Sequence, residues 1–329
     1  MKVLVVAVSA RMLATLADAD GHEVVALDRF GDVDLRAIAP GATARRSAAL
    51  VALAEHVEAD AVVYGAGLEN RPDLVARLAT ARELLGTPAE LLPAVRDPWT
   101  LSEVVRVPET VRAATGDGWL RKPLHGGGGR GIRRWTGGQL RPAEILQRRV
   151  DGLSCSAVAI GNGRDAVLLG ITEQLHRGYS WIGNRLLADA AIEQRLRAAC
   201  ETVVARFGVR GAFGVDAIWD GSGLWVLEVN PRPTASLELF GPGAFALHVR
   251  GARGHDLDRP IPPPCAKVKL VLFADRDIRA PALDWWPTGL VRDIPHPGET
   301  IRRGQPVCTL LDPVDAEGLL SLLPEAVHA

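Results

Sequence analysis

The first feature of this sequence that could do chemistry is a lysine followed by a glycine-rich segment. Lys122 closes a short stretch with strand character, and five of the six residues 126–131 are glycine. Glycines let backbone N–H groups surround phosphate oxygens, and a lysine ammonium can neutralise the same oxygens. The chain has 34 arginines and only four lysines, so a lysine hints at a need for a compact ammonium. The segment predicts phosphate binding; the alternative is a mobile surface hairpin.

A second set of polar side chains lies further along, on two expected strands joined by a turn at 220–223. Alternation on the later strand places Glu228 and Asn230 on one face, and the turn brings Asp216 beside Glu228. Carboxylate and amide oxygens are ligands that Mg²⁺ prefers. Arg232 continues the same face, where a guanidinium can hold a transferring phosphoryl group. This pattern predicts metal-assisted phosphoryl transfer; the alternative is a salt-bridged hairpin without a metal.

Alternating strands and helices must position these residues. Residues 1–90 show a βαβ pattern, which indicates an open parallel sheet. The first strand-to-helix turn contains no glycine, which argues against a dinucleotide-binding site. The periodicity predicts helices at 11–19, 98–105 and 190–207, and strands at 2–8, 23–27, 61–64, 155–160, 166–171, 214–219, 224–229 and 267–273.

The overall composition is that of an ordinary globular protein. A net charge of −1 gives no electrostatic footprint for nucleic acid or an anionic membrane. The four cysteines are scattered and form no Cys-x-x-Cys pair, which is typical of buried thiols in a reducing compartment. The apolar N-terminal run is too short to span a membrane and lacks a cleavage site. We therefore expect a cytoplasmic protein without nucleic-acid or membrane partners.

Taken in order, three elements resemble the ATP-grasp superfamily: the Lys122 strand with its glycine-rich segment, the strand end at 145–152 and the hairpin from Asp216 to Arg232. Within it, the chain looks most like a predicted carboligase group related to biotin carboxylase. The marks of that group here are YGAGLEN at 64–70, VRDPW at 95–99, QRRVDGLSCS at 147–156 and LEVNPRPTAS at 227–236. Some members of that group occur with genes of tetrahydromethanopterin- or methanofuran-linked one-carbon metabolism. The specific resemblance covers residues 91–260.

This resemblance implies an α/β and α+β architecture in three parts. Residues 1–90 would form a Rossmann-like pre-ATP-grasp domain with a parallel sheet. Residues 91–260 would form the two-lobed ATP-grasp domain, with a glycine-rich lid at about 122–136. Residues 261–329 would form a small β-rich C-terminal domain, similar to the tail of biotin-carboxylase relatives.

The resemblance also implies roles for individual residues. Lys122 and Arg232 would be catalytic, and Asp216, Glu228 and Asn230 would hold one or two Mg²⁺ ions, with Mn²⁺ as an acceptable substitute. The implied ATP-binding set is Arg96, Lys122, Gly126, Gly127, Gly128, Gly129, Gly131, Gln147, Arg148, Arg149, Val150 and Ser154. Two positions depart from the pattern: Arg96 replaces a second phosphate-binding lysine, and Ser154 lies where a ribose-binding acid is usual. Both departures bear on nucleotide affinity more than on fold.

The implied function is an ATP-dependent carboxylate–amine ligase that forms an acyl phosphate and releases ADP and phosphate. Its partners would be a small carboxylic acid and an amine acceptor, and we expect a homodimer. Substrate contacts are expected from Glu69 at the first sheet's edge, from Glu173 at a strand end and from Ser236 just past Arg232. Two alternatives stay open: a biotin-carboxylase-like carboxylase and a non-catalytic ATP-binding module.

Overall fold

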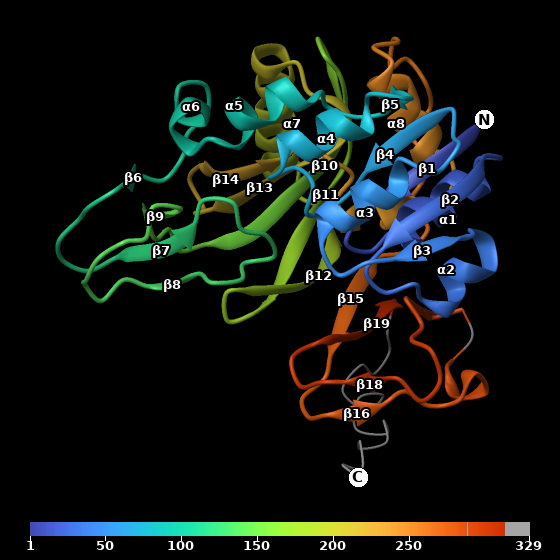
Figure 1. Ribbon diagram of the computed structural model, residues 1–329. Coiled ribbons are helices and arrows are strands. Elements are labelled where there is room, and N and C mark those ends of the chain that lie inside the picture. The colour runs from blue at the N-terminus through green and yellow to red at the C-terminus, as the bar shows by residue number, and fades with distance from the viewer. Residues whose placement is uncertain (288, 313–329) are drawn as a thin grey trace.

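The computed structural model describes residues 1–287 and 289–312, and its N-terminal part is a five-stranded parallel sheet (Figure 1). The strand order is β3-β2-β1-β4-β5. The strands are β1 (Lys2–Val6), β2 (Glu23–Asp28), β3 (Gly41–Thr43), β4 (Ala61–Tyr64) and β5 (Glu83–Leu84). Because both faces of a parallel sheet are covered, its strands read as continuous apolar runs. This confirms the parallel sheet predicted from the βαβ pattern.

Two pairs of helices cover the two faces of this sheet. Leu13 of α1 (Arg11–Ala19) and Leu35 of α2 (Val33–Ile38) pack with alternate strand residues such as Val3. On the other face, Leu50 of α3 (Ser47–Ala54) and Leu74 of α4 (Pro72–Leu78) pack with the intervening residues such as Leu4. The carboxyl ends of the strands therefore meet at one uncovered edge, which carries residues 65–70 after β4.

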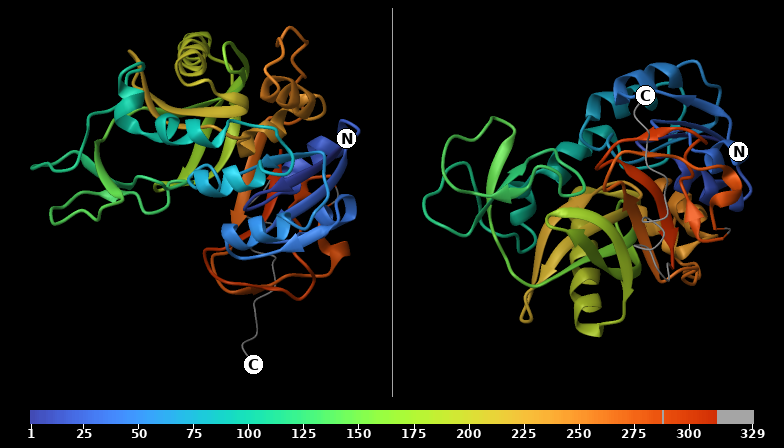
Figure 2. Two further views of the ribbon diagram at one scale, coloured as in Figure 1. Left: turned by 45° about the horizontal axis from the view of Figure 1, so that its top comes forward. Right: turned by 90° about the horizontal axis from the view of Figure 1, so that it is seen from below.

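A small lobe projects away from the rest of the molecule (Figures 1 and 2). It is a four-stranded sheet with the order β6-β9-β7-β8. Its strands are β6 (Thr110–Val111), β7 (Trp119–Pro123), β8 (Arg133–Arg134) and β9 (Glu144–Arg148). The glycine-rich segment connects β7 to β8, so it is the loop of an antiparallel hairpin. We call residues 124–132 the glycine loop.

Short helices lead from the parallel sheet into this lobe. They are η1 (Ala89–Leu91), α5 (Leu92–Arg96) and α6 (Pro98–Ser102), and Asp97 caps α6 by accepting a hydrogen bond from the backbone N–H of Thr100. The helix predicted at 98–105 was therefore too long. Its last two predicted residues are Val104 and Val105, whose β-branched side chains disfavour further helix.

The largest element is a sheet of eight strands in the order β14-β13-β10-β11-β12-β15-β19-β17. These are β10 (Leu153–Asn162), β11 (Ala166–Arg177), β12 (Ser180–Leu187), β13 (Arg210–Trp219), β14 (Leu224–Asn230), β15 (Val268–Phe273), β17 (Val291–Arg292) and β19 (Pro306–Leu311). Helix α7 (Ala190–Phe207) buries its stripe of Ile192, Leu196 and Val203 against one face. This is the amphipathic helix predicted at 190–207.

The described part of the tail is divided between two sheets. Strand β15 pairs with β12, and β19 and β17 follow it, so three tail strands extend the large sheet. Strands β16 (Ile278–Arg279) and β18 (Thr300–Ile301) form a separate pair. The short helix η3 (Leu283–Trp285) lies between them in sequence. The domain limits 1–90, 91–260 and 261–329 stay predictions, and residues 313–329 lie outside the described residues.

The second face of the large sheet changes character along its strands. At one end, Val158, Ile160 and Ala212 are buried under α8 (Ala244–Ala252) and η2 (Ala235–Phe240). Further along the same face, beyond the cover of these helices, the residues are polar. They are Ser156, Thr172, Asp216 and Glu228, on four strands whose registers align them. This polar stretch is where a site can form.

Two chain-wide features remain. All four cysteines are free thiols, and three of them are buried. Within residues 1–287 and 289–312, every helix falls short of the length and apolar character that crossing a bilayer requires.

Candidate functional site

The centre of the site is a pair of carboxylates on neighbouring strands. Asp216 of β13 lies directly opposite Glu228 of β14, and Asn230 lies opposite Gly214. The Asn230 side-chain amide donates a hydrogen bond of 2.9 Å to Asp216 Oδ2. Antiparallel pairing therefore places the three predicted oxygen ligands on one face, at the end of one hairpin.

The two carboxylates titrate differently because their surroundings differ. Burial, and then the neighbouring Glu228 carboxylate, raise the pKa of Asp216 to about 7. Burial would also raise the pKa of Glu228, but Arg96 and Lys122 outweigh it and lower that pKa. A pair of adjacent carboxylates with one proton between them is a site that a divalent cation can occupy by displacing the proton.

Arg96 connects this pair to the glycine loop. Its Nη1 donates to the Val229 carbonyl at 3.0 Å and lies 3.4 Å from both Glu228 Oε2 and Asn230 Oδ1. Its Nη2 donates to the carbonyl of Gly126 at 3.2 Å. The arginine that replaces a usual lysine thus lies among the acidic side chains, at the entrance to the loop.

Lys122 faces the same carboxylates from the small lobe. Its Nζ donates a 2.8 Å hydrogen bond to Gln147 Oε1, and Gln147 in turn donates to Thr110 Oγ1 at 3.2 Å. Burial lowers the pKa of Lys122, while the charges of Glu228 and Asp216 act to raise it. The ammonium and the two carboxylates therefore share one electrostatic environment, although they come from two different sheets.

The glycine loop is docked at its tip. The backbone N–H of Trp181 donates to the Gly128 carbonyl at 3.1 Å. A Cβ on Gly129 would lie 1.8 Å from the Tyr179 carbonyl oxygen, and the φ of Gly129 is +70°. Only glycine fits both the backbone conformation and the contact. The loop thus bridges the small lobe and the β11–β12 hairpin.

Arg232 ties the site to the edge of the parallel sheet. Its Nε lies 2.9 Å from Oε1 of Glu69, a carboxylate that is only 3% exposed and also accepts a hydrogen bond from the Gly67 N–H. The Arg232 Nη2 lies 3.4 Å from Asn230 Oδ1. Burial alone would raise the pKa of Glu69, but Arg232 lowers it. Glu69 therefore holds Arg232 in position, which is a different role from the substrate contact expected for it.

Some expected site residues lie elsewhere. Glu173 points to the opposite face of β11 from Thr172, and pairs with Arg185 at 3.2 Å. Ser236 is buried, with its hydroxyl 3.0 Å from that of Thr234. The structure does not bring either one to the carboxylate pair.

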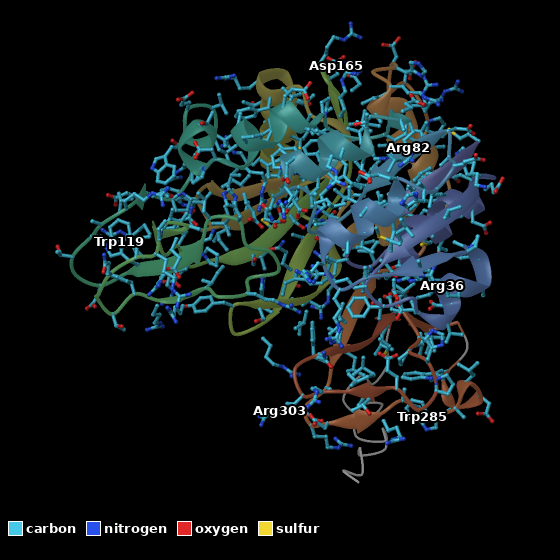
Figure 3. All side chains as sticks on the ribbon, in the orientation of Figure 1. Arg36, Arg82, Trp119, Asp165, Trp285 and Arg303 are labelled. Atoms are coloured by element: carbon cyan, nitrogen blue, oxygen red, sulfur yellow. The ribbon has the colours of Figure 1, made fainter. Side chains whose placement is uncertain are left out.

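Residues 147–150 of the expected ATP-binding set are divided. Gln147 points into the site, whereas the Arg148 guanidinium stacks 4.2 Å above the Trp119 ring, which Figure 3 labels. Arg149 pairs with Asp151. The backbone N–H groups of Arg148 and Arg149 donate to the carbonyls of Glu109 and Gly118, each at 2.8 Å.

Gln174 is a residue of the site that lies outside the expected ATP-binding, metal and substrate sets. Its Nε2 donates to Asp216 Oδ1 at 2.8 Å, and its Oε1 accepts a 3.0 Å hydrogen bond from Ser154. Ser154 thereby orients Gln174. Strand alternation, which places Gln174 on the face of Thr172, was the available signal.

The donor set suits a magnesium ion that shares its coordination with a substrate. Within the described part of the chain, no group of three His, Cys, Asp or Glu side chains could hold a metal. Asp216, Glu228 and Asn230 offer two carboxylates and one amide. Mg²⁺ is commonly held by one or two carboxylates and completed by phosphate oxygens and water, so these three residues fit it when a phosphate-bearing substrate is present.

Comparisons with known proteins agree with this arrangement. Residues 99–236 match the ATP-grasp domain family. A formate-dependent phosphoribosylglycinamide formyltransferase from Variovorax paradoxus is 29% identical over 120 residues. That match spans 35% of this chain and only 28% of the relative's length.

Two solved structures show the same fold over nearly the whole chain. N5-carboxyaminoimidazole ribonucleotide synthetase from Thermus thermophilus superposes with a TM-score of 0.69 at 19% identity, covering 99% of both chains. The biotin carboxylase domain of 2-oxoglutarate carboxylase from Hydrogenobacter thermophilus superposes with a TM-score of 0.72 at 15% identity, covering 94% of this chain and 85% of that one. The chain therefore adopts the ATP-grasp fold, and its residues 99–236 are similar to the ATP-grasp domain family, as the sequence resemblance implied.

Proposed function

We propose that this protein is an ATP-dependent ligase that joins a carboxylate to an amine through an acyl phosphate, with release of ADP and phosphate. The observation that carries the proposal is the convergence of Lys122, Arg96 and Arg232 on the Asp216–Glu228 pair. Cations around a metal-binding carboxylate pair suit phosphoryl transfer, in which catalysis is mainly positioning and electrostatic stabilisation.

Each residue has a defined task in this proposal. Asp216, Glu228 and Asn230 hold Mg²⁺, which neutralises charge on phosphate oxygens when it is bound. Lys122 supplies a positive charge from the small lobe, and the glycine loop offers backbone N–H groups. Arg232 is held by Glu69 beside Asn230 and stabilises the phosphoryl group during transfer. The glycine loop excludes water from the reacting groups.

The comparisons support the reaction type through what their proteins are described as doing. The Hydrogenobacter domain was solved as a dimer with MgADP, ADP and bicarbonate, and the Variovorax relative is formate-dependent. Both proteins thus involve a small one-carbon acid. By analogy, we propose a small carboxylic acid as substrate, Mg²⁺ as the metal and a homodimer as the assembly. A role in one-carbon cofactor biosynthesis is a further part of this proposal.

An ADP-release screen tests the proposal. The full-length protein is incubated with Mg–ATP, pooled amino acids, amines and pterin- or furan-type acids, and bicarbonate in a separate arm. We expect ADP and phosphate to appear only when both an acid and an amine are present. Lys122→Ala should abolish release, whereas Lys2→Ala is the matched control, because Lys2 pairs with Glu23 at the surface.

Three outcomes would contradict the ligase. AMP and pyrophosphate as products would indicate another activation chemistry. ADP release that requires bicarbonate but no amine would favour the biotin-carboxylase-like carboxylase. Tight Mg–ATP binding without turnover across all pools would favour a non-catalytic nucleotide-binding module.

A further inference from the structure

A cavity of about 330 Å³ lies where three separate segments meet. Its walls come from the glycine loop, the β11–β12 hairpin and the tail around β15 and residue 303. In Figure 1 the β12 hairpin descends toward the tail, and Figure 3 labels Arg303 on that tail. The volume falls within the usual range for small-ligand pockets. The cavity adjoins the glycine loop, which follows the strand that carries Lys122.

Positive charge converges on this cavity. Arg130, Arg177 and Arg303 line it, one from each segment. Among residues 1–287 and 289–312, the guanidinium groups of these three arginines have no hydrogen-bond or ion-pair partner; the hydrogen bond from Arg303 to Asp277 is made by its backbone N–H. The one acidic residue of the lining, Asp275, pairs with Arg276 at 2.9 Å. Three unpaired guanidinium groups around one hollow favour an anionic occupant.

Aromatic side chains form another part of the wall. Trp181 and Phe273 both line the cavity. The Trp181 indole N–H donates to Asn184 Oδ1 at 3.0 Å, which fixes the orientation of the ring. An apolar surface of this kind suits a flat organic framework more than a bare inorganic ion.

The cavity is separate from the expected position of the metal. Asp216 aligns with Ser156 and through it with Thr172 of β11. Arg177 lies five residues further along β11 than Thr172, which is roughly 16 Å at about 3.3 Å per strand residue. A ligand held here would keep its charged end away from the reacting group. Binding energy from such a remote group can hold the reacting end in place.

We propose that this cavity binds one of the two non-nucleotide substrates, the acid or the amine. We propose further that this substrate carries two or more negative charges on a flat apolar framework. The charged group is a phosphate ester or a pair of carboxylates. This inference rests on the proposed ligase function, since it assigns a binding site to a substrate of that reaction other than ATP. The recognition chemistry is nevertheless testable without turnover.

The test is calorimetric titration of the full-length protein with phenyl phosphate and with isophthalate, with its neutral diamide, isophthalamide, as the uncharged control. We expect at least one dianion to bind and isophthalamide to bind at least about tenfold more weakly. We expect each of the variants Arg177→Ala and Arg303→Ala to bind the dianion about tenfold more weakly than wild type does. Arg302→Ala is the matched control, because Arg302 neighbours Arg303 but does not line the cavity.

Other arms separate the two proposals and the two charged groups. The Lys122→Ala variant should lose affinity for Mg–ATP but still bind the dianion. A wild-type protein that binds the dianion but never releases ADP would reject the proposed ligase function and support the assignment of the cavity. Preference for phenyl phosphate or for isophthalate identifies the charged group. If the diamide binds as tightly as the dianions, if Arg303→Ala binds like wild type, or if Lys122→Ala abolishes dianion binding, the assignment of the cavity is wrong. Arg303→Gln, checked by circular dichroism, repeats the test if an alanine variant fails to fold.

Discussion

Two clusters of charged side chains in this protein have nearly the same composition and opposite properties. The site cluster contains Lys122, Arg96, Arg232, Asp216 and Glu228. The core cluster contains Arg11 of α1, Glu238 of η2, Lys269 of β15 and Asp293 after β17. In the core cluster, Arg11 lies between Glu238 and Asp293, with Nη2 distances of 3.1 and 3.0 Å, and Lys269 Nζ lies 2.5 Å from Glu238.

The difference lies in the pairing of charges and in exposure. Every member of the core cluster touches an opposite charge, and the Glu238 side chain is 7% exposed. In the site cluster the two carboxylates touch each other, and the Glu228 side chain is 34% exposed. Buried and alternating charges hold the parallel sheet, the large sheet and the tail together. Like charges in contact at a partly exposed position await a ligand.

The largest effect should come from breaking the core cluster. Glu238→Gln leaves Lys269 without its ion-pair partner and leaves Arg11 buried with Asp293 and, at 3.7 Å, Asp34 as counter-charges. Removing one partner of a buried ion pair typically costs about 3–5 kcal/mol, so we expect a loss of this size in the free energy of unfolding by urea. The matched control is Glu55→Gln at an exposed pair. Equal stability of the two variants would remove the structural role assigned to the core cluster.

A substitution in the site cluster should lower activity and leave the free energy of unfolding almost unchanged. Glu228→Gln keeps the side-chain shape but removes the charge that faces Lys122 and the proposed magnesium site. We expect ADP release to fall by about 10²–10³-fold, as for loss of one preorganised electrostatic group, and Mg–ATP affinity to fall with it. Because Glu228 is partly exposed, the unfolding free energy should change by about 1 kcal/mol or less. A large loss of stability with retained nucleotide affinity would make this cluster structural as well.

The same comparison shows what the sequence could reveal. The Asp216–Glu228 pair was predictable because a short turn joins its strands, and alternation then fixes the face. The scarcity of lysine drew attention to Lys122, which faces the two carboxylates. Scarcity alone does not separate Lys122 from Lys269, which is buried and serves the core cluster.

Contacts between distant segments had no local signal. Glu69 and Arg232 are 163 positions apart, and no periodicity connects them. The fold shows the same limit. The bounds of α7 agree with its prediction because Asp189 caps its first turn and Gly208 ends it at φ +68°.

Strand β12 was missed, because its central Gly183 interrupts the expected pattern. A Cβ at Gly183 would lie 2.2 Å from the Lys269 carbonyl oxygen. The glycine is therefore required by the neighbouring strand β15, which is far away in sequence. Tertiary packing decided this element, and local preference did not.

A smaller effect is expected in the pH dependence of stability, and it comes from Asp32, which is close enough to Asp293 of the core cluster to be influenced by its charge. Burial, and then the neighbouring Asp293, Asp28 and Asp34, raise the pKa of Asp32 to about 8. Between the ordinary carboxyl pKa near 4 and this value, the folded chain binds more protons at Asp32 than the unfolded chain does. The resulting stabilisation is complete below pH of about 4 and is lost as pH rises through about 8.

Asp32→Asn should remove this dependence, since an amide does not titrate. We expect the variant to gain stability relative to wild type as pH rises from 6 to 7.5, by at most about 1.4 kcal/mol per pH unit. Urea unfolding at both pH values measures the difference. Parallel curves for the two proteins would show that Asp32 is ionised in the folded protein, and that the neighbourhood of the core cluster carries one more negative charge than we infer.

The smallest effect should come from an ion pair that belongs to neither cluster. Arg77 of α4 lies 2.5 Å from Glu55, and their side chains are 46% and 50% exposed. Water screens such a pair, and ordering two long side chains offsets much of the attraction, so exposed pairs contribute about 0–1 kcal/mol. We expect Arg77→Ala to change the free energy of unfolding, measured with urea, by no more than this. A loss as large as that of Glu238→Gln would mean that burial does not distinguish structural charge pairs in this protein, and the contrast between the two clusters would then rest on like-charge contact alone.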